Sequence, residues 1–260
     1  MDVQIYRMSD CMNPLIPADG VYRLSANKLS MYQACPFKHY LYLTHQESGE
    51  FDDTYIMAGN AVHKYMEEHM KGEGKPIESY IAEFNVKPEV LDRVKACIEN
   101  APTYLALDGI PELKEYTEFT TPKGRNIKLE SRIDLQVDNA DLPDVKGKVV
   151  IDYKTGKTIK TPKNNMQMQV YRFVRNFEYS AMLVSLYTGE TVVLDKSPKN
   201  YIPNLCDRYI DAIENNDFPR KRGSNCERFC PYYQMFCTSE HMYDQIIPKM
   251  VYKDGKWYEE

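Results

Sequence analysis

Two acidic residues and a lysine in the second half of the chain have the types and the spacing needed for chemistry on a phosphate ester. Asp152 ends the apolar run VVID, and Lys154 follows two residues later in DYKTG. Because side chains two positions apart in a strand project from the same face, we expect these two groups to lie together. Asp134 stands within a second β-rich segment, IDLQV, where a charged side chain is costly unless it is paired or bound to a metal.

A divalent cation would relieve the repulsion between two such carboxylates. The cation can polarise a phosphate and lower the pKa of a bound water, so that hydroxide forms near neutral pH. A lysine beside it can activate that water or offset the charge of the transition state. The alternative interpretation is an ordinary ion pair at an exposed strand edge, which the D-x-K pattern alone favours.

A histidine and a glutamine–tyrosine pair are further candidates. His63 lies four residues after Gly59 on a predicted helix. It could serve as a third metal ligand, since imidazole suits manganese-type sites less than zinc sites but does occur in them. Gln167 and Tyr171 are four residues apart and therefore share one face of a later predicted helix. The alternatives are a packing histidine and a polar helix face that covers the sheet.

In this order the residues resemble the motifs of the RecB-type branch of the PD-(D/E)XK nucleases. The matching motifs are G-x-x-x-H at Gly59 and His63, R-x-D at Arg132-Ile133-Asp134, D-x-K-T-G at 152–156, and Q-x-x-x-Y at Gln167 and Tyr171. The resemblance covers about residues 25–237 and implies a restriction-endonuclease-like α/β core.

The resemblance also implies a role for each matching residue. The ligands of Mg²⁺ or Mn²⁺ would be His63, Asp134, Asp152 and the backbone carbonyl of Tyr153. Lys154 would be catalytic together with the two aspartates, and Gln167 and Tyr171 would orient Lys154 or contact DNA. The implied activity is that of a metal-dependent deoxyribonuclease. We expect an exonuclease that acts on single strands or DNA ends, in recombination, repair, phage DNA metabolism or CRISPR adaptation.

Clustered cysteines form a second feature. Cys226, Cys230 and Cys237 lie within twelve residues, in the pattern C-x3-C-x6-C. Seven cysteines is an odd number, which argues against a secreted disulfide scaffold. Three thiolates from one segment need a fourth to complete a zinc site or a four-iron cluster, and Cys35 is the candidate.

The same nuclease family carries one cysteine before the core, commonly in Y-x-x-C-P, and three after it, and these bind [4Fe-4S]. Residues Tyr32 to Pro36 match the first pattern. The usual C-terminal pattern is C-x2-C-x5-C, so both gaps here are one residue longer and zinc stays open. We expect the cluster to join the N-terminal and C-terminal segments, and we assign no metal to the remaining cysteines, Cys11, Cys97 and Cys206.

These residues require a small mixed sheet flanked by helices, which is the α/β class. Helices are predicted from Ser25 or Asn27, over 59–70, 77–107, 163–177 and 198–217, and strands over 115–121, 125–137, 148–153, 183–187 and 191–195. The segment PKG at 122–124 predicts a hairpin turn, and residues 1–24 look irregular. We expect one domain over 1–260, with an N-terminal helical part at 25–58, a core at 59–197 that contains a helical insertion at 77–107, and a C-terminal part at 198–260.

Composition limits the functional classes. The 260 residues are 43% hydrophobic with 21 tyrosines, which excludes a disordered chain. No apolar run approaches the ~20 residues of a membrane helix, and we expect neither a secretory signal nor a membrane, hence a cytoplasmic protein. The net charge of −5 means that DNA contacts need a local basic track. The candidates for that track, which could equally be a solvated face, are Lys157, Lys160, Lys163, Arg172 and Arg175.

Two rival functions stay open. The first is a CRISPR spacer-acquisition nuclease, which a neighbouring integrase gene would distinguish. The second is a non-catalytic cluster-bearing module for DNA binding or assembly, and the intact set of His63, Asp134, Asp152 and Lys154 argues against it. The chain has no phosphate-binding loop of the G-x-x-x-x-G-K-[ST] type, so a helicase, recombinase or integrase partner would supply any motor or joining step.

Overall fold

A computed structural model describes residues 15–45, 53–221, 226, 230, 232, 233, 237, 250–253 and 256–259. The helices are α1 (Ala26–Ala34), α2 (Pro36–His45), α3 (Thr54–Met70), α4 (Ile77–Glu83), the 3₁₀ turn η1 (Pro88–Val90), α5 (Leu91–Asn100), α6 (Pro102–Leu105), α7 (Pro162–Val174) and α8 (Tyr201–Glu214). The strands are β1 (Val21–Ser25), β2 (Gly109–Thr120), β3 (Asn126–Asp141), β4 (Lys146–Lys154), β5 (Ser180–Ser185), β6 (Thr191–Leu194), β7 (Met250–Lys253) and β8 (Lys256–Glu259).

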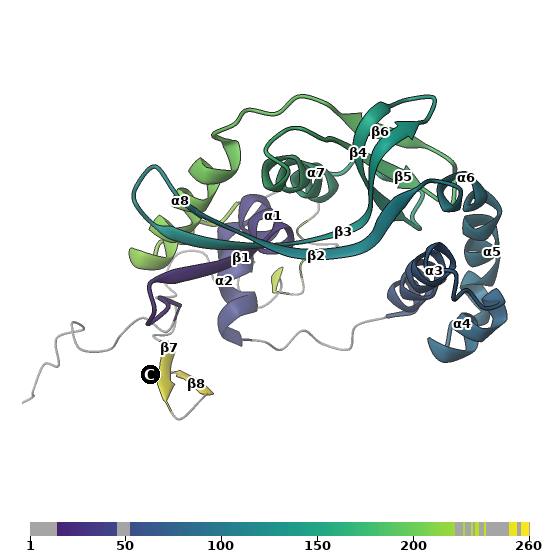
Figure 1. The fold of residues 1–260 in the computed structure, drawn as a ribbon. Helices are drawn as coiled ribbons and strands as arrows, with labels where there is room; N and C mark the ends of the chain where they lie inside the picture. The colour runs from purple at the N-terminus through teal and green to yellow at the C-terminus, as the bar shows by residue number, and fades with distance from the viewer. Residues whose placement is uncertain are drawn as a thin grey trace, which may run out of the picture.

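Strands β1 to β6 form one mixed sheet, so the predicted α/β class is confirmed. Along its main path the strands follow the order β1-β3-β4-β5-β6, and β2 pairs with β3 outside that path. The β1–β3 and β4–β5 pairs are parallel, and the others are antiparallel. Strand β3 is long enough to pair with β1 over its first part and with β4 over its second. Figure 1 shows the resulting curled sheet between two groups of helices.

The hairpin between β2 and β3 turns where the sequence predicts it. Gly124 adopts φ +82°, a left-handed conformation that glycine tolerates without steric cost. The turn fixes an antiparallel register that runs from Thr120 opposite Asn126 to Gly109 opposite Val137. This register decides which side chains of β2 face those of β3 at the far end of the hairpin.

Two hydrophobic clusters cover the sheet. One is formed with helices α1, α2, α7 and α8, and the other with α3 to α6. Alternate residues of β4 enter different clusters: Val150 belongs to the first, and Val149 and Ile151 to the second. Strand β4 is therefore buried on both faces, which explains its continuous apolar sequence.

Local caps fix the helices that carry or border the site. The Ser25 side chain accepts a hydrogen bond from the amide of Lys28 and caps α1. Thr161 caps α7 in the same way, through the amide of Asn164, with Pro162 at the first helical position.

Three differences from the predicted boundaries concern the first half of the chain. Strand β1 lies within the segment predicted to be irregular, α3 begins at Thr54 rather than Gly59, and β2 begins at Gly109 rather than residue 115. The last two differences lengthen an element beyond its most periodic stretch. Within the described residues, no helix is long and apolar enough to cross a membrane.

Candidate active site

Five elements bring the candidate residues to one place. Helix α3 supplies His63, β2 supplies Glu112, and β3 supplies Asp134. Asp152 and Lys154 stand at the end of β4, and α7 adds one polar face of Gln167 and Tyr171. The fold thus gathers every predicted catalytic side chain, and it adds one that the sequence prediction did not include.

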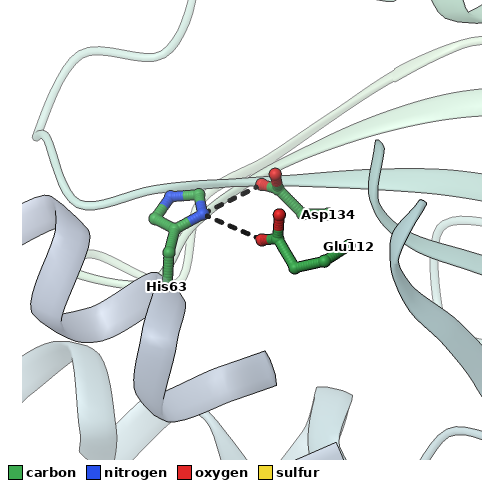
Figure 2. Close-up of side chains that lie close together, drawn as sticks. All are labelled: His63, Glu112 and Asp134. Atoms are coloured by element: carbon green, nitrogen blue, oxygen red, sulfur yellow. Dashed lines mark ion pairs between the residues drawn. The ribbon is translucent and has the colours of Figure 1, made fainter. Parts of the chain in front are cut away.

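His63, Glu112 and Asp134 form a compact group of possible metal ligands. The three ligand atoms lie within 4.8 Å of one another. Nδ1 of His63 is 3.4 Å from Oδ2 of Asp134 and 4.0 Å from Oε1 of Glu112 (Figure 2). Figure 2 shows the two carboxylates pointing from the sheet toward the imidazole on the helix. One nitrogen and several carboxylate oxygens are a donor set that suits a divalent cation such as Mn²⁺ or Mg²⁺.

Asp134 is held from the neighbouring strand as well. Its Oδ2 accepts a 2.7 Å hydrogen bond from the backbone amide of Tyr153. Burial would raise the pKa of Asp134, but the charge of His63, this amide and Lys154 outweigh it and lower that pKa. Asp134 is therefore ionised and fixed in direction, as a metal ligand must be.

The pKa values of His63 and Glu112 show that this group of carboxylates favours a positive charge beside it. Burial works against a charged His63, yet Asp134, then Asp152 and Glu112, raise the pKa of His63 to about 9. Without metal, the imidazole is thus protonated at neutral pH and balances the carboxylates. Burial and the neighbouring Asp134 also raise the pKa of Glu112, to about 6. A metal ion would take the place of the histidine proton.

A second network surrounds Asp152 and Lys154. Nζ of Lys154 lies 2.5 Å from Oδ2 of Asp152 and donates a 2.9 Å hydrogen bond to Oε1 of Gln167. The Gln167 amide donates to Oδ1 of Asp152 at 2.5 Å and to the hydroxyl of Tyr171 at 2.7 Å. The Tyr171 hydroxyl donates to the carbonyl oxygen of Arg132 and lies 3.1 Å from Oδ1 of Asp152. The lysine is thereby held by two partners at the end of its strand.

Asp152 is the most buried carboxylate of the site, at 1% exposure. Burial and the charge of Asp134 raise its pKa, and Lys154 and His63 oppose that rise. Two carboxylates that repel each other in the interior, with a histidine and a lysine against them, fit the chemistry of a divalent metal site.

Glu112 is the residue that sequence reasoning missed. The β2–β3 register places it directly across from Asp134, between the pairs Pro111–Leu135 and Leu113–Ile133. Its φ of +49° is unusual for a residue other than glycine. Like charges opposite each other destabilise a sheet, and a left-handed glutamate adds strain. The signal was available, because a hairpin turn centred on residue 123 pairs position 112 with position 134.

The residues of the predicted basic track differ in their exposure. Lys157 and Lys163 lie outside the core, and Lys160 pairs with Glu190 at 2.8 Å. Arg172, in contrast, is only 5% exposed and donates to the carbonyl oxygen of Leu194. A guanidinium held in the interior is not available to a phosphate, so the prediction of a DNA contact by Arg172 is corrected.

Arg175 is also engaged within the fold. Its Nη1 lies 3.0 Å from Oε2 of Glu115 on β2, and its side chain is 18% exposed. This ion pair joins the end of α7 to the hairpin. The accessible part of the track therefore consists of the three lysines.

The four cysteines predicted to bind metal are among the described residues, and Cys11 is not. Cys35 accepts a 3.5 Å contact from the amide of Lys221, and the carbonyl of Lys221 faces the thiol of Cys226 at 4.0 Å. Burial, together with the thiols of Cys230, Cys35 and Cys226, raises the pKa of Cys237. Among the described cysteines, however, no three sulfur atoms approach within 4.8 Å of one another.

Cys97 and Cys206 lie elsewhere, in the interior of α5 and α8. Both are 0% exposed, and burial raises the pKa of each thiol to about 12. These are the properties of packing residues.

A half-buried acid–histidine group lies beside a lysine at the end of a central strand, on a mixed sheet flanked by helices. This arrangement is consistent with a restriction-endonuclease-like fold. The sequence profile of the PD-(D/E)XK nuclease superfamily matches residues 23–238, and the chain belongs to this superfamily. A comparison with curated proteins found no match. A solved structure described as "Crystal structure of SSO0001" is similar, with 13% sequence identity and a TM-score of 0.45 over 83% of this chain and 86% of that chain.

Proposed function

We propose that this protein is a metal-dependent DNA exonuclease that degrades single strands or strand ends. Membership of the superfamily supports a metal-dependent nuclease. The observation that carries the proposal is the pair of adjoining networks: His63, Glu112 and Asp134 on one side, and Asp152 with Lys154 on the other. The first offers ligands for a cation, and the second offers a lysine next to it.

Each side chain has a role in this proposal. His63, Asp134 and Asp152 would hold Mg²⁺ or Mn²⁺ with the backbone carbonyl of Tyr153, and Glu112 joins them as a ligand from β2. When bound, the cation supplies polarisation of the phosphate and an acidified water. His63 would be deprotonated as a ligand, and the amide of Tyr153 keeps Asp134 in place.

Lys154 would act on the attacking water and on the charge that builds on the phosphate. Its ammonium group stands between Asp152 and Gln167, both within 2.9 Å. Gln167 is a positioning residue, because it bonds Lys154 and Asp152 through the two ends of one amide. Tyr171 holds that glutamine from one helical turn further along.

The decisive experiment is a cleavage assay on end-labelled DNA. Anaerobically purified protein is incubated with single- and double-stranded DNA, labelled at either the 5′ or the 3′ end, with Mn²⁺ or Mg²⁺. Short products from one labelled end would support an exonuclease, and internal fragments would identify an endonuclease. Lys154→Ala should lower the rate by several orders of magnitude, because it removes the group that serves the water.

Lys148→Ala is the matched control. Lys148 lies on the same strand, is exposed, and pairs with Glu178 at 3.0 Å far from the catalytic lysine's partners. The control should cleave like the wild type. Wild-type rates in Lys154→Ala, or no cleavage by the parent with either metal, would overturn the proposal.

We further propose that Cys35, Cys226, Cys230 and Cys237 hold one [4Fe-4S] cluster. Amide–carbonyl hydrogen bonds join Cys230 to Cys226 and Cys237 to Tyr233, in helical steps of four residues. Spacings of four and seven residues bring the three thiols toward one side of such turns. Lys221 contacts both Cys35 and Cys226, which supports Cys35 as the fourth ligand.

Four thiolates can hold either one zinc ion or a four-iron cluster, and the resemblance to the cluster-bearing nucleases favours iron. The cluster would tie α1–α2 to the segment after α8, about 190 positions later in the sequence, and its binding energy would then stabilise the fold. We also propose that the protein acts in the cytoplasm, together with a helicase, recombinase or integrase partner.

A further inference from the structure

Two tyrosines and two cations form a stack at the surface near the proposed site. The guanidinium of Arg93 on α5 lies 4.6 Å from the ring centre of Tyr55 and 5.3 Å from that of Tyr187. Nζ of Lys157 lies 5.6 Å from the same Tyr187 ring. Tyr55 is 56% exposed, among the most exposed large hydrophobic side chains of the described residues. We call these four residues the Tyr–Arg stack.

Two of its members are tied to the catalytic strand. The amide of Leu186 donates a 2.8 Å hydrogen bond to the carbonyl oxygen of Lys154. Tyr187 directly follows Leu186, so this bond fixes its backbone relative to the proposed catalytic lysine. The hydroxyl of Ser185 donates to the carbonyl oxygen of Gly156, one residue before Lys157. Hydrogen bonds to the end of β4 and to the turn after it therefore hold the backbone next to Tyr187 and Lys157.

Helix α3 connects the stack to the proposed metal group. Tyr55, Gly59 and His63 follow one another at intervals of four residues, so they share one face of the helix. Gly59 faces the turn after β4, because a Cβ atom there would lie 3.5 Å from Oγ1 of Thr155. Eight residues at 1.5 Å each separate Tyr55 from His63 by roughly 12 Å, a distance of a few nucleotides.

The charge of the stack depends on the ion pairs that the described residues make with its two cations. Within the described part of the chain, neither Arg93 nor Lys157 has a carboxylate at ion-pair distance. Tyr116 on β2 is a contrasting case: it is 50% exposed and lies near Lys114 and Lys128. Both of those lysines are paired with glutamates, at 3.3 Å each. An exposed ring beside unpaired cations suits a ligand that offers both a flat ring and a negative charge.

We infer that the Tyr–Arg stack binds the single strand of DNA that enters the active site, with bases on the tyrosines and phosphates on Arg93 and Lys157. This rests on the proposed nuclease function. Unpaired bases stack on aromatic side chains, whereas the bases of a duplex are already stacked on each other. Cations along the same track hold the backbone without reading its sequence. The stack thus selects single-stranded over double-stranded substrate.

The test measures binding in the Lys154→Ala background, so that the DNA stays intact. Dissociation constants are determined with Mn²⁺ for a fluorescein-labelled single-stranded oligonucleotide and for the same sequence as a blunt duplex. Tyr55→Leu and Tyr187→Leu should each weaken single-strand binding about fivefold or more, since each removes one stacking ring. The duplex constant should change less than twofold. Tyr55→Phe, which keeps the ring, should bind single strands like the background protein.

Tyr116→Leu is the matched control, with the same substitution at similar exposure beside neutralised lysines. Single-strand binding within twofold of the background in both Tyr55→Leu and Tyr187→Leu would overturn the inference. So would an equal loss in Tyr116→Leu or an equal loss for the duplex. Cleavage of end-labelled DNA by the wild type reports separately on the nuclease. No cleavage with either metal would sink the proposed function, while a selective loss of single-strand binding would still support the stack.

Discussion

Nζ of Lys154 lies 2.5 Å from Oδ2 of Asp152, and the two residues are separated by one position of β4. The same strand end therefore presents a metal-ligand candidate and the lysine that serves the water, on one face and in contact. Gln167 on α7 bonds both of them. The relative position of strand and helix thus sets the direction of the lysine.

The first prediction concerns this positioning. Gln167→Ala should lower kcat for DNA cleavage by about 10- to 100-fold, because an ångström of misplacement in a reacting group can cost that much. The Mn²⁺ concentration for half-maximal rate should stay the same, since Gln167 is not a ligand. Steady-state rates over a manganese titration check both. A general loss of folding would change melting temperature and metal response together, which would contradict a positioning role.

The second prediction concerns His63, whose loss should change the metal requirement more than the maximal rate. His63→Ala should raise the Mn²⁺ concentration needed for half-maximal rate, because the variant lacks the nitrogen 3.4 Å from Asp134. At saturating Mn²⁺ much of the rate should return. The measurement is a metal titration of wild type and variant side by side. Coinciding curves would show that His63 only packs against the sheet.

Glu112 should behave differently in the absence and presence of metal. Glu112→Gln removes a carboxylate that faces Asp134 across the hairpin, so the metal-free protein should be at least as stable as the wild type. With Mn²⁺, the wild type should gain more stability than the variant, because it has one more charged ligand. Thermal melting in EDTA and in Mn²⁺ gives both differences. An equal gain from Mn²⁺ in both proteins would exclude Glu112 from the metal site.

The residues that the sequence singled out as a site lie together in the structure. Asp134 and Asp152 could be found because a charge in an apolar strand needs a partner, wherever the strand begins, and His63 and Lys154 were found by their spacing from Gly59 and Asp152. Glu112 was missed because it is far from Asp134 in the sequence. The two residues face each other only through a hairpin whose register depends on the turn at Gly124. The left-handed backbone of Glu112 has no signature in the sequence.

The basic track failed at Arg172 for a related reason. Spacing along the chain showed a run of cations near the site, but it could not show which of them α7 turns inward. Arg172 points toward β6, where it meets the carbonyl of Leu194. The Tyr–Arg stack joins four distant segments, so only the folded chain reveals it.

The next prediction concerns the iron content and visible absorbance of the proposed cluster. Cys35→Ser should lower the iron content of anaerobic protein and reduce its broad absorbance near ~400 nm, and the protein should unfold at a lower temperature. Cys97→Ala is the control: its thiol is buried in α5, so it should lose stability to packing and keep its iron. Iron analysis with absorbance spectra decides. A colourless wild-type protein with one zinc would replace the cluster by a zinc site and leave the nuclease proposal standing.

The last prediction concerns stability and pH. His39 on α2 is fully buried, with Nε2 3.0 Å from the hydroxyl of Tyr209. Burial, with a smaller contribution from Lys28, lowers the pKa of His39 to about 4, from an ordinary value of 6.5. The unfolded chain therefore binds a proton at this residue between those two pH values, whereas the folded protein does not. Stability from this residue is fully present above pH 6.5 and is lost as the pH falls toward 4.

Between pH 7.5 and pH 5 the loss should be about 2 kcal/mol of unfolding free energy. His39→Gln retains polar atoms for Tyr209 and does not titrate, so its unfolding free energy should fall less over the same interval. Urea denaturation of both proteins at the two pH values measures the difference between the slopes, because the carboxylates contribute equally to each. If the two proteins lose the same stability, His39 is either protonated in the folded state or accessible to water.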